Sequence, residues 1–342
     1  MTDLNTKLEI FDAIATRRNE RRSFLRFAGG SAIALGGATL LSACGSDDSD
    51  LAPSPTPSPT PTAALNDADV LNFALNLEYL EAQFYAYAAF GVGLNASLLT
   101  GTGTQGGVTG GAQVPFSDTV VREYAREIAI DEVAHVAFLR SALGTAVVAQ
   151  PALDISAGTA AAPGAFTSAA RAAGVIGATG VFNPYADDNS FLLGAYIFED
   201  VGVSAYKGAS PLIANKTYLE AAAGILAAEA YHAGLIRTIL FRKGLTTPSL
   251  VTGANQISDA RDSLDGTVTN TSTGVIGDDD QGITGSDATM SNIVPTDANG
   301  LAYSRSTGQV LNIVYLNKTA VSMGGFFPAG VNGNIKTSAA NA

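Results

Sequence analysis

Glu132-Val133-Ala134-His135 and Glu229-Ala230-Tyr231-His232 are the two stretches that decide the fold of this chain, and they contain both of its histidines. In a helix, residues three apart project from the same face, so each stretch presents a carboxylate and an imidazole to one point. The chain has only ten glutamates, and two histidines that both have a glutamate three residues earlier arise by chance with odds of roughly one in a thousand. The pattern, written E-x-x-H, therefore predicts a shared polar site between helices.

Two more glutamates repeat a second spacing. Glu78 and Glu199 lie in apolar sequence, and each is followed seven residues later by a tyrosine, Tyr85 or Tyr206. The chain thus contains a degenerate duplication, because each half supplies a glutamate with its tyrosine and then an E-x-x-H. Glu81 competes with Glu78 for the same role, and the shared tyrosine spacing favours Glu78.

Helical periodicity surrounds all of these residues. It predicts four long helices, over residues 68–90, 118–143, 191–207 and 216–243. Asp67 and Ser117 are expected N-caps, and Gly144, Gly208 and Gly244 are expected to lie just past helix ends. About 46 residues, 145–190, separate the second helix from the third. Such a long middle connection is what a four-helix bundle with one crossover requires, so the predicted fold class is all-α.

The sequence resembles the ferritin-like superfamily of dimetal carboxylate proteins, whose sites use one glutamate from each of two helices and an E-x-x-H from each of the other two. Residues 71–82 and the stretch Gly324-Gly325-Phe326-Phe327-Pro328 are similar to bacterial ferritin-like proteins related to plant desiccation-associated proteins. The resemblance covers most of the chain from Ala68 onward and implies a ferritin-like bundle. The metal ligands that it implies are Glu78, Glu132, His135, Glu199, Glu229 and His232, with Glu132 and Glu229 bridging.

Charge balance favours two bound divalent ions. Four carboxylates that converge in a dry interior repel one another, and two divalent cations cancel their charge. Oxygen and nitrogen ligands without sulfur suit iron or manganese, and zinc also fits. No basic side chain lies at helical spacing toward these positions, with Arg122 and Arg126 as the exceptions. The alternative is a site that has lost its metal and whose polar side chains satisfy one another.

Such a centre predicts redox or oxidative-stress chemistry with O₂ or a peroxide, as an oxidoreductase. Tyr85 and Tyr206 would then be hydrogen-bond donors or redox-active groups near the metals; the alternative is that they are packing residues. The second class of function is a non-enzymatic stress- or desiccation-protective envelope protein with a structural or vestigial metal site.

The first 44 residues have the order of an export signal. Arg21 and Arg22 precede an apolar stretch, residues 27–43, and the small-residue site Leu41-Ser42-Ala43-Cys44. The pair resembles a twin-arginine signal and the site resembles a lipobox, so Cys44 is the expected lipidation site. Residues 45–66 form a Pro/Ser/Thr-rich linker. We expect a periplasmic or cell-envelope lipoprotein that is exported by the twin-arginine machinery and anchored to a membrane.

Composition excludes several other classes. The chain has 19 Lys and Arg against 31 Asp and Glu, a formal net charge of −12, which argues against nucleic acid as a partner. One cysteine excludes an intramolecular disulfide framework. The predicted domains are the bundle, residues 67–244, and a loop-rich extension packed on it, residues 245–342, with one helical candidate at 309–318. The expected lipid anchor with its linker and this extension favour a monomer or small oligomer over a storage cage.

The extension also contains an acidic run, Asp278-Asp279-Asp280, which is a candidate for Ca²⁺ binding. Its spacing matches no EF-hand loop. The usual explanation for such a run is a solvated charged surface, and this is the expectation here.

Overall fold

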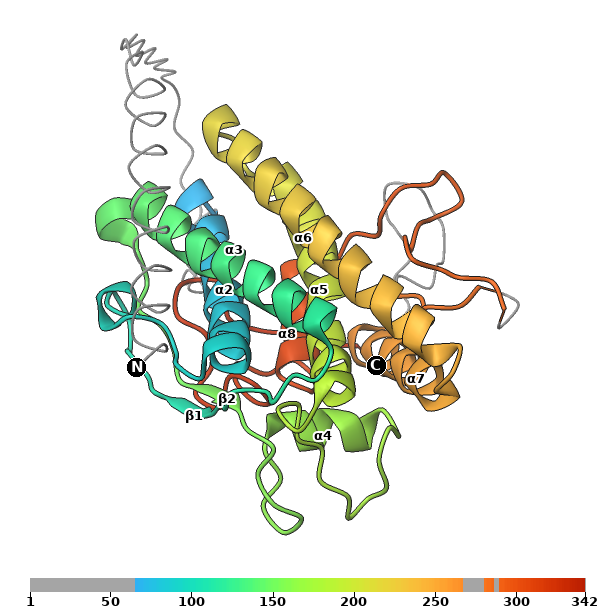
Figure 1. Cartoon of the computed structure of the whole chain (residues 1–342). Helices are drawn as coiled ribbons and strands as arrows, with labels where there is room; N and C mark the ends of the chain where they lie inside the picture. Colours follow the sequence, from blue (N-terminus) through green and yellow to red (C-terminus); the bar gives the residue numbers. More distant parts are fainter. Residues whose placement is uncertain (1–64, 267–279, 286–288, 342) are drawn as a thin grey trace, which may run out of the picture. The chain divides into compact units, whose positions relative to one another are not determined.

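Four long helices form the centre of the computed structural model, which describes residues 65–266, 280–285 and 289–341 (Figure 1). They are α2 (Asp67–Phe90), α3 (Thr119–Leu143), α5 (Asp188–Ala209) and α6 (Lys216–Gly244). α2 packs against α3 and α5 packs against α6, so the helices form two hairpins that meet through α2–α5 and α3–α6 contacts. The predicted all-α bundle with one long crossover is confirmed. The predicted export signal and stalk, up to residue 64, lie outside the described residues.

Local capping shifts three of the four predicted helix starts by one to three residues, and α6 begins at Lys216 as predicted. α2 begins after Asn66, whose side chain forms a reciprocal capping box, so Asp67 is the first helical residue and not the cap. The cap of α3 is Asp118, whose carboxylate accepts backbone N–H groups of the first turn. Ser117 is not the cap because its backbone N–H and hydroxyl both donate to Asp188 at the start of α5.

Gly208 does not end α5, contrary to the sequence-based expectation, because the helix continues to Ala209. A Cβ at Gly208 would lie only 1.9 Å from the carbonyl oxygen of Arg305. The glycine is therefore needed for the close approach of a later segment to the helix and not for a turn.

The connections between the helices contain short elements. They are η1 (Ala96–Leu98) and β1 (Val108–Gly110) between α2 and α3, η2 (Gly144–Ala146), β2 (Leu153–Ile155) and α4 (Ala165–Ala172) in the crossover, and η3 (Ser210–Leu212) before α6. β1 and β2 pair in parallel, with Val108 opposite Leu153. This two-stranded sheet ties the crossover to the first interhelical connection.

The C-terminal part contains two helices, α7 (Pro248–Asp265) and α8 (Thr307–Val314). α8 overlaps the predicted candidate at 309–318 but begins two residues earlier. α7 was not predicted, and the expectation of loops directly after the bundle is corrected there. The reason is that the buried face of α7 mixes Ile257 with the polar Ser258, Arg261 and Asp265. A helix that buries charged residues has no clear apolar period.

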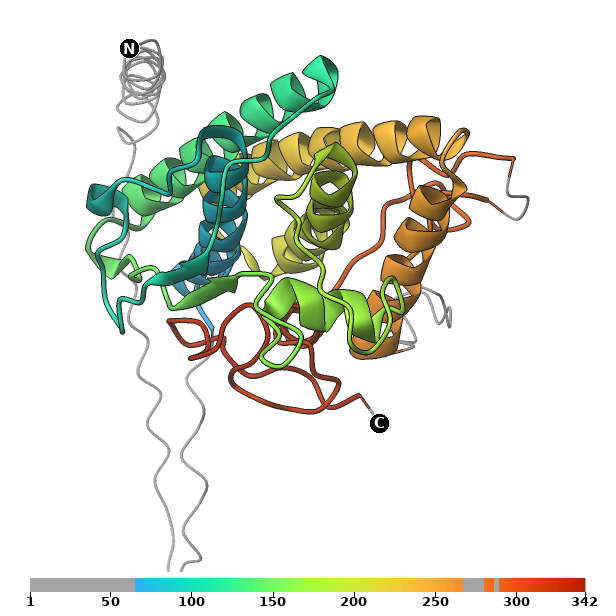
Figure 2. The ribbon, with the colours of Figure 1, turned by 60° about the horizontal axis from the view of Figure 1, so that its bottom comes forward.

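The chain after α8 covers the bundle (Figure 2). The backbone N–H of Asn332 donates to the Asn76 side chain of α2 at 2.9 Å, and Phe326 packs edge-on against Phe198 of α5 with ring centroids 4.9 Å apart. α2 is consequently buried on nearly all sides, which makes it a core helix. Within the described ranges, no helix combines the length and apolarity that crossing a bilayer would need.

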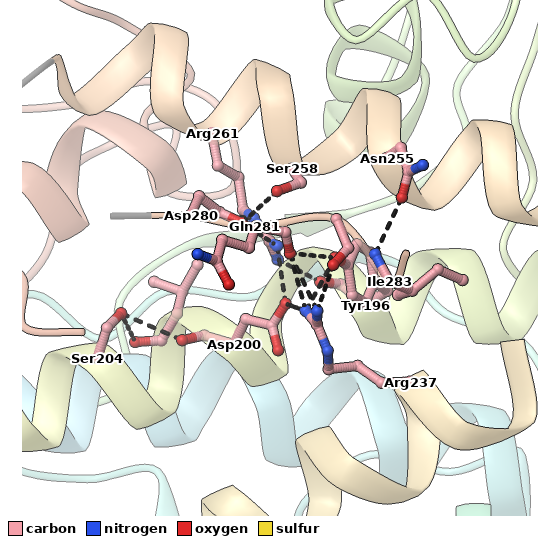
Figure 3. Close-up of polar contacts among 12 residues, drawn as sticks. Tyr196, Asp200, Ser204, Arg237, Asn255, Ser258, Arg261, Asp280, Gln281 and Ile283 are labelled. Atoms are coloured by element: carbon pink, nitrogen blue, oxygen red, sulfur yellow. Dashed lines mark hydrogen bonds and ion pairs between the residues drawn. The ribbon is translucent and has the colours of Figure 1, made fainter. Parts of the chain in front are cut away.

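A buried network of three arginines and three aspartates fastens the C-terminal part to α5 and α6, and Figure 3 shows Arg237, Arg261, Asp200 and Asp280 of this network. Arg237 of α6 and Arg261 of α7 both bind Asp200 Oδ2 of α5, at 2.7 and 2.8 Å. Arg261 Nε also lies 2.7 Å from Asp280 Oδ2, and Arg305 lies 2.8 Å from the same oxygen and pairs with Asp265. The three positive and three negative charges balance, so the network can remain ionised in the interior.

This network also shows what one residue of the acidic run at 278–280, the candidate for Ca²⁺ binding, does in the fold. Asp280 is 5% exposed, and its carboxylate is held by Arg261, Arg305 and the hydroxyl of Ser258. The arginines keep the pKa of Asp280 below its usual range, against the effect of burial. Asp280 is therefore a structural ion-pair partner and not a solvated charge, and Asp278 and Asp279 lie outside the described residues.

Candidate metal centre

The six predicted ligands meet inside the bundle, although they are spread over residues 78 to 232. They are Glu78 from α2, Glu132 and His135 from α3, Glu199 from α5, and Glu229 and His232 from α6. All six are buried, and the two imidazole rings lie with their centroids 6.2 Å apart. We call these six residues the Glu/His cluster.

Donor atoms of the cluster form two groups, in each of which the atoms lie within 4.8 Å of one another. The first group is Glu78, Glu132, His135 and Glu229; the second is Glu199, Glu229 and His232. Glu229 belongs to both groups. Glu132 also spans them, because its Oε2 is 3.6 Å from His135 Nδ1 and its Oε1 is 3.1 Å from His232 Nδ1. The two glutamates expected to bridge are thus the two that face both groups.

Tyr85 and Tyr206 connect the halves of the duplication crosswise. The hydroxyl of Tyr85 donates to Glu199 Oε1, and that of Tyr206 donates to Glu78 Oε1, so each tyrosine serves the glutamate of the other half. Burial raises the pKa of both phenols well above the usual value, and the nearby carboxylates raise it further. They are hydrogen-bond donors to the cluster as well as packed side chains. Their redox activity stays a prediction.

Burial in a group of carboxylates makes most of the acidic groups hold protons. It raises the pKa of Glu78 to about 7 and that of Glu199 to about 8, and it raises that of Glu229 far above the usual value. Glu132 is the exception, since His135 and His232 beside it outweigh the effect of burial and lower its pKa. The cluster thus places one ionised carboxylate between two imidazoles.

The donor atoms that make no hydrogen bond show whether a metal would fit the cluster. Six buried atoms of the cluster make no hydrogen bond of acceptable geometry to any described residue: Glu132 Oε1 and Oε2, Glu199 Oε2, Glu229 Oε1 and Oε2, and His232 Nδ1. Buried donors and acceptors without hydrogen bonds are costly, and cations that bind oxygen and nitrogen would satisfy all of these. The donor set therefore fits a metal site.

Arginine does not neutralise the cluster. Arg122 pairs with Glu123 on the surface of α3, and Arg126 lies over the ring of Phe90. In the part of the chain that the structure describes, no Lys or Arg forms an ion pair with a cluster carboxylate. Glu81, the competitor of Glu78, is buried nearby but belongs to neither group.

Asp131 is a residue that sequence analysis missed. Its Oδ2 lies 3.6 Å from His232 Nε2, on the side of the ring that faces away from the cluster. Burial lowers the pKa of His232, but Asp131 and Glu132 outweigh that effect and raise it to about 10. A carboxylate on the second ring nitrogen fixes the tautomer that leaves Nδ1 for a metal. The feature of the sequence that could have identified Asp131 is its position directly before Glu132 in α3.

Replacing Asp131 with Asn should weaken metal binding about 10- to 100-fold, because the amide no longer holds the His232 ring as a charged acceptor. A metal titration followed by calorimetry measures this. Glu127→Gln, an exposed glutamate of the same helix, is the matched control and should bind metal as the wild type does. Equal affinities for the Asp131→Asn variant and this control would show that Asp131 does not position the ring.

Metal affinity should also rise with pH, from about pH 6 up to about pH 10. Glu78, Glu199 and His232, with pKa values of about 7, 8 and 10, must lose protons before they can bind a cation, so protons compete at low pH. Each displaced proton adds about a tenfold gain in affinity per pH unit. Metal titrations in buffers of different ionisation enthalpy measure the number of protons released, and a pH-independent affinity would contradict the expectation.

Comparisons with known proteins agree with the helical fold. The sequence model of the ferritin-like domain family matches residues 66–242. A ferritin-like catalase of Nesocodon mauritianus is 29% identical over 79% of this chain and 84% of its own length. A desiccation-related protein of Craterostigma plantagineum is 31% identical over 78% of this chain and 83% of its own length. No solved structure gives a significant match.

Proposed function

Because this chain belongs to the ferritin-like domain family, we propose that it holds two iron or manganese ions in the Glu/His cluster and uses them to decompose hydrogen peroxide. The observation that carries the proposal is the set of six buried donor atoms that make no hydrogen bond, shared between two groups that have Glu229 in common. Similarity to a protein named a ferritin-like catalase supports peroxide as the oxidant.

The reaction balances without another reactant. One peroxide molecule is oxidised to O₂ and releases two electrons and two protons; the second accepts them, its O–O bond breaks, and two water molecules form. Bound iron or manganese would supply reversible storage for the two electrons.

The protein's own residues would set the geometry of the site. Glu78 and Glu199, whose pKa values without metal are about 7 and 8, would bind the ions in their ionised form. The hydroxyls of Tyr206 and Tyr85 hold these two carboxylates in place from the opposite half of the bundle. Burial of the whole cluster limits the access of bulk water to the reacting groups.

The test is an oxygen-electrode measurement on protein loaded with Mn(II) or Fe(II), with elemental analysis of the same sample. We expect one O₂ for every two H₂O₂ consumed, and no turnover with Glu132→Ala. Glu127→Gln serves as the control and should keep full turnover. Metal binding at the cluster without O₂ release would reject the catalase activity.

A second candidate function follows from the desiccation-related relative, which is 31% identical to this chain. In that case the metals would hold the bundle together and protect it against unfolding without turnover. Chelation would then lower the melting temperature while peroxide is left untouched. The same loaded sample separates the two functions.

We also propose that the chain is exported and anchored to a membrane. Arg21-Arg22, the apolar stretch and the site that ends at Cys44 support a twin-arginine signal with a lipobox. Export of a folded protein would let the metals bind before translocation. Replacing the signal with a Sec-type signal should change the metal content of the purified protein, and unchanged content would contradict this order of events.

A further inference from the structure

The duplication of the bundle is broken at one position beside the Glu/His cluster. Glu81 lies three residues after Glu78 on α2, and Gly202 lies three residues after Glu199 on α5. The spacing that aligns the two glutamates and their tyrosines therefore aligns Glu81 with Gly202. One half supplies an additional carboxylate, and the other half supplies no side chain at all.

Gly202 leaves the space in which two carboxylates lie. A Cβ at this position would be 2.3 Å from Glu229 Oε2 and 3.6 Å from Glu81 Oε1. A contact of 2.3 Å is far below the van der Waals limit, so any other residue at 202 would displace Glu229. Glu81 thus reaches across from α2 to the part of α5 one turn after Glu199, beside Glu229.

The two donor groups differ in the number of residues that they contain. The first has four residues, whereas Glu199, Glu229 and His232 form a group of three. Glu81 lies outside both groups, but its Oε1 is 3.6 Å from the position of a Cβ at Gly202, beside Glu229, and its side chain is 6% exposed. Among the residues for which the structure gives side chains, no Lys or Arg pairs with its carboxylate. A buried carboxylate in this position needs a cation or a proton as partner.

We propose that Glu81 is a seventh protein ligand, which completes the Glu199–Glu229–His232 group, and that Gly202 makes room for it. This inference rests on the proposed dimetal site. Five carboxylates then surround the centre, where two divalent ions balance only four charges. The additional charge favours a trivalent ion at this position, so the two metals are inequivalent.

The test compares metal binding of the full chain with that of Glu81→Gln, a variant of equal size without the charge. Manganese titrations, elemental analysis after dialysis and the electron paramagnetic resonance spectrum are the measurements. We expect two ions in the wild type, and in the variant one ion retained and the second bound at least tenfold more weakly, with an altered two-metal spectrum. Glu220→Gln, an exposed glutamate of α6, is the control and should match the wild type.

Gly202→Ala tests the same space from the other helix, and we expect weaker binding of both ions, because the new methyl group displaces Glu229, which belongs to both groups. Glu81→Asp, which keeps the charge but withdraws the carboxylate from this space, decides the case if Glu81→Gln does not fold. Gly224→Ala is the matched control, since a Cβ at that glycine meets nothing within 4 Å. Two ions with unchanged affinity and spectrum in the folded Glu81→Gln variant would overturn the inference but leave the proposed function intact. Absence of metal from the wild type would overturn both.

Discussion

Glu132→Ala should remove metal binding altogether, so that the metal content falls from about two ions per chain to near zero. The two oxygens of Glu132 face His135 and His232, at 3.6 and 3.1 Å, so one substitution takes a ligand from both groups. No neighbouring side chain can replace it, because the remaining carboxylates already face the same two positions.

The loss of metal binding should also appear as a loss of thermal stabilisation by metal. A ligand present at a thousand times its dissociation constant stabilises a folded protein by about 4 kcal/mol, which corresponds to a melting temperature roughly 10 °C higher in a domain of this size. We expect this rise in the wild type on addition of metal and none in Glu132→Ala. Thermal scans with and without metal, together with elemental analysis, measure both effects.

The control for this prediction is Glu127→Ala, which removes an exposed glutamate from the same helix. It should keep both the metal content and the rise in melting temperature. If Glu132→Ala kept two ions, the assignment of the Glu/His cluster as the metal site would be wrong.

Arg237→Ala should destabilise the protein by about 3–5 kcal/mol, independently of metal. The guanidinium is fully buried and binds Asp200, the hydroxyl of Tyr196 and the carbonyl oxygens of Gln281, Gly282 and Asn292. Its removal leaves a net negative charge in the interior and three carbonyl groups without this donor. The C-terminal segment that supplies these carbonyls should also become easier to cleave, because the arginine fastens it to α6.

Unfolding in urea measures the change in free energy, and limited proteolysis reports on the C-terminal segment. Arg126→Ala is the matched control, since its guanidinium is half-exposed and lies 3.8 Å from Glu123, a pair worth at most about 1 kcal/mol. A loss of less than 1 kcal/mol for Arg237→Ala would mean that the network does not fasten the C-terminal part.

The four-helix bundle could be predicted from the sequence because helix formation depends on local spacing. Periodicity placed all four long helices, and the errors are at their ends, where Asn66 and Asp118 cap in place of Asp67 and Ser117. α7 was missed because its buried positions include Arg261, Asp265 and Ser258. A pattern based on apolar residues does not register a helix whose buried face is held by ion pairs.

The candidate ligands could be predicted for the same reason. Glu132 with His135 and Glu229 with His232 must share a helix face whatever surrounds them. The resemblance to the ferritin-like superfamily implied Glu78 and Glu199 as their partners, and the duplicated tyrosine spacing favoured Glu78 over Glu81. Spacing along one helix does not show which residues its side chains contact across the bundle. Asp131 opposite His232 and Glu81 opposite Gly202 are pairings of this second kind.

The sequence by itself thus determined the four long helices, the E-x-x-H pairs and the acidic character of the interior, because each of these depends on neighbours within a few positions. Only the tertiary structure decided that Tyr85 serves Glu199 and Tyr206 serves Glu78, and that Asp280 joins Arg261 and Arg305. These contacts depend on how the two hairpins and the C-terminal part pack. Packing is the result of all side chains filling one interior together, and it cannot be obtained from any single stretch of the chain.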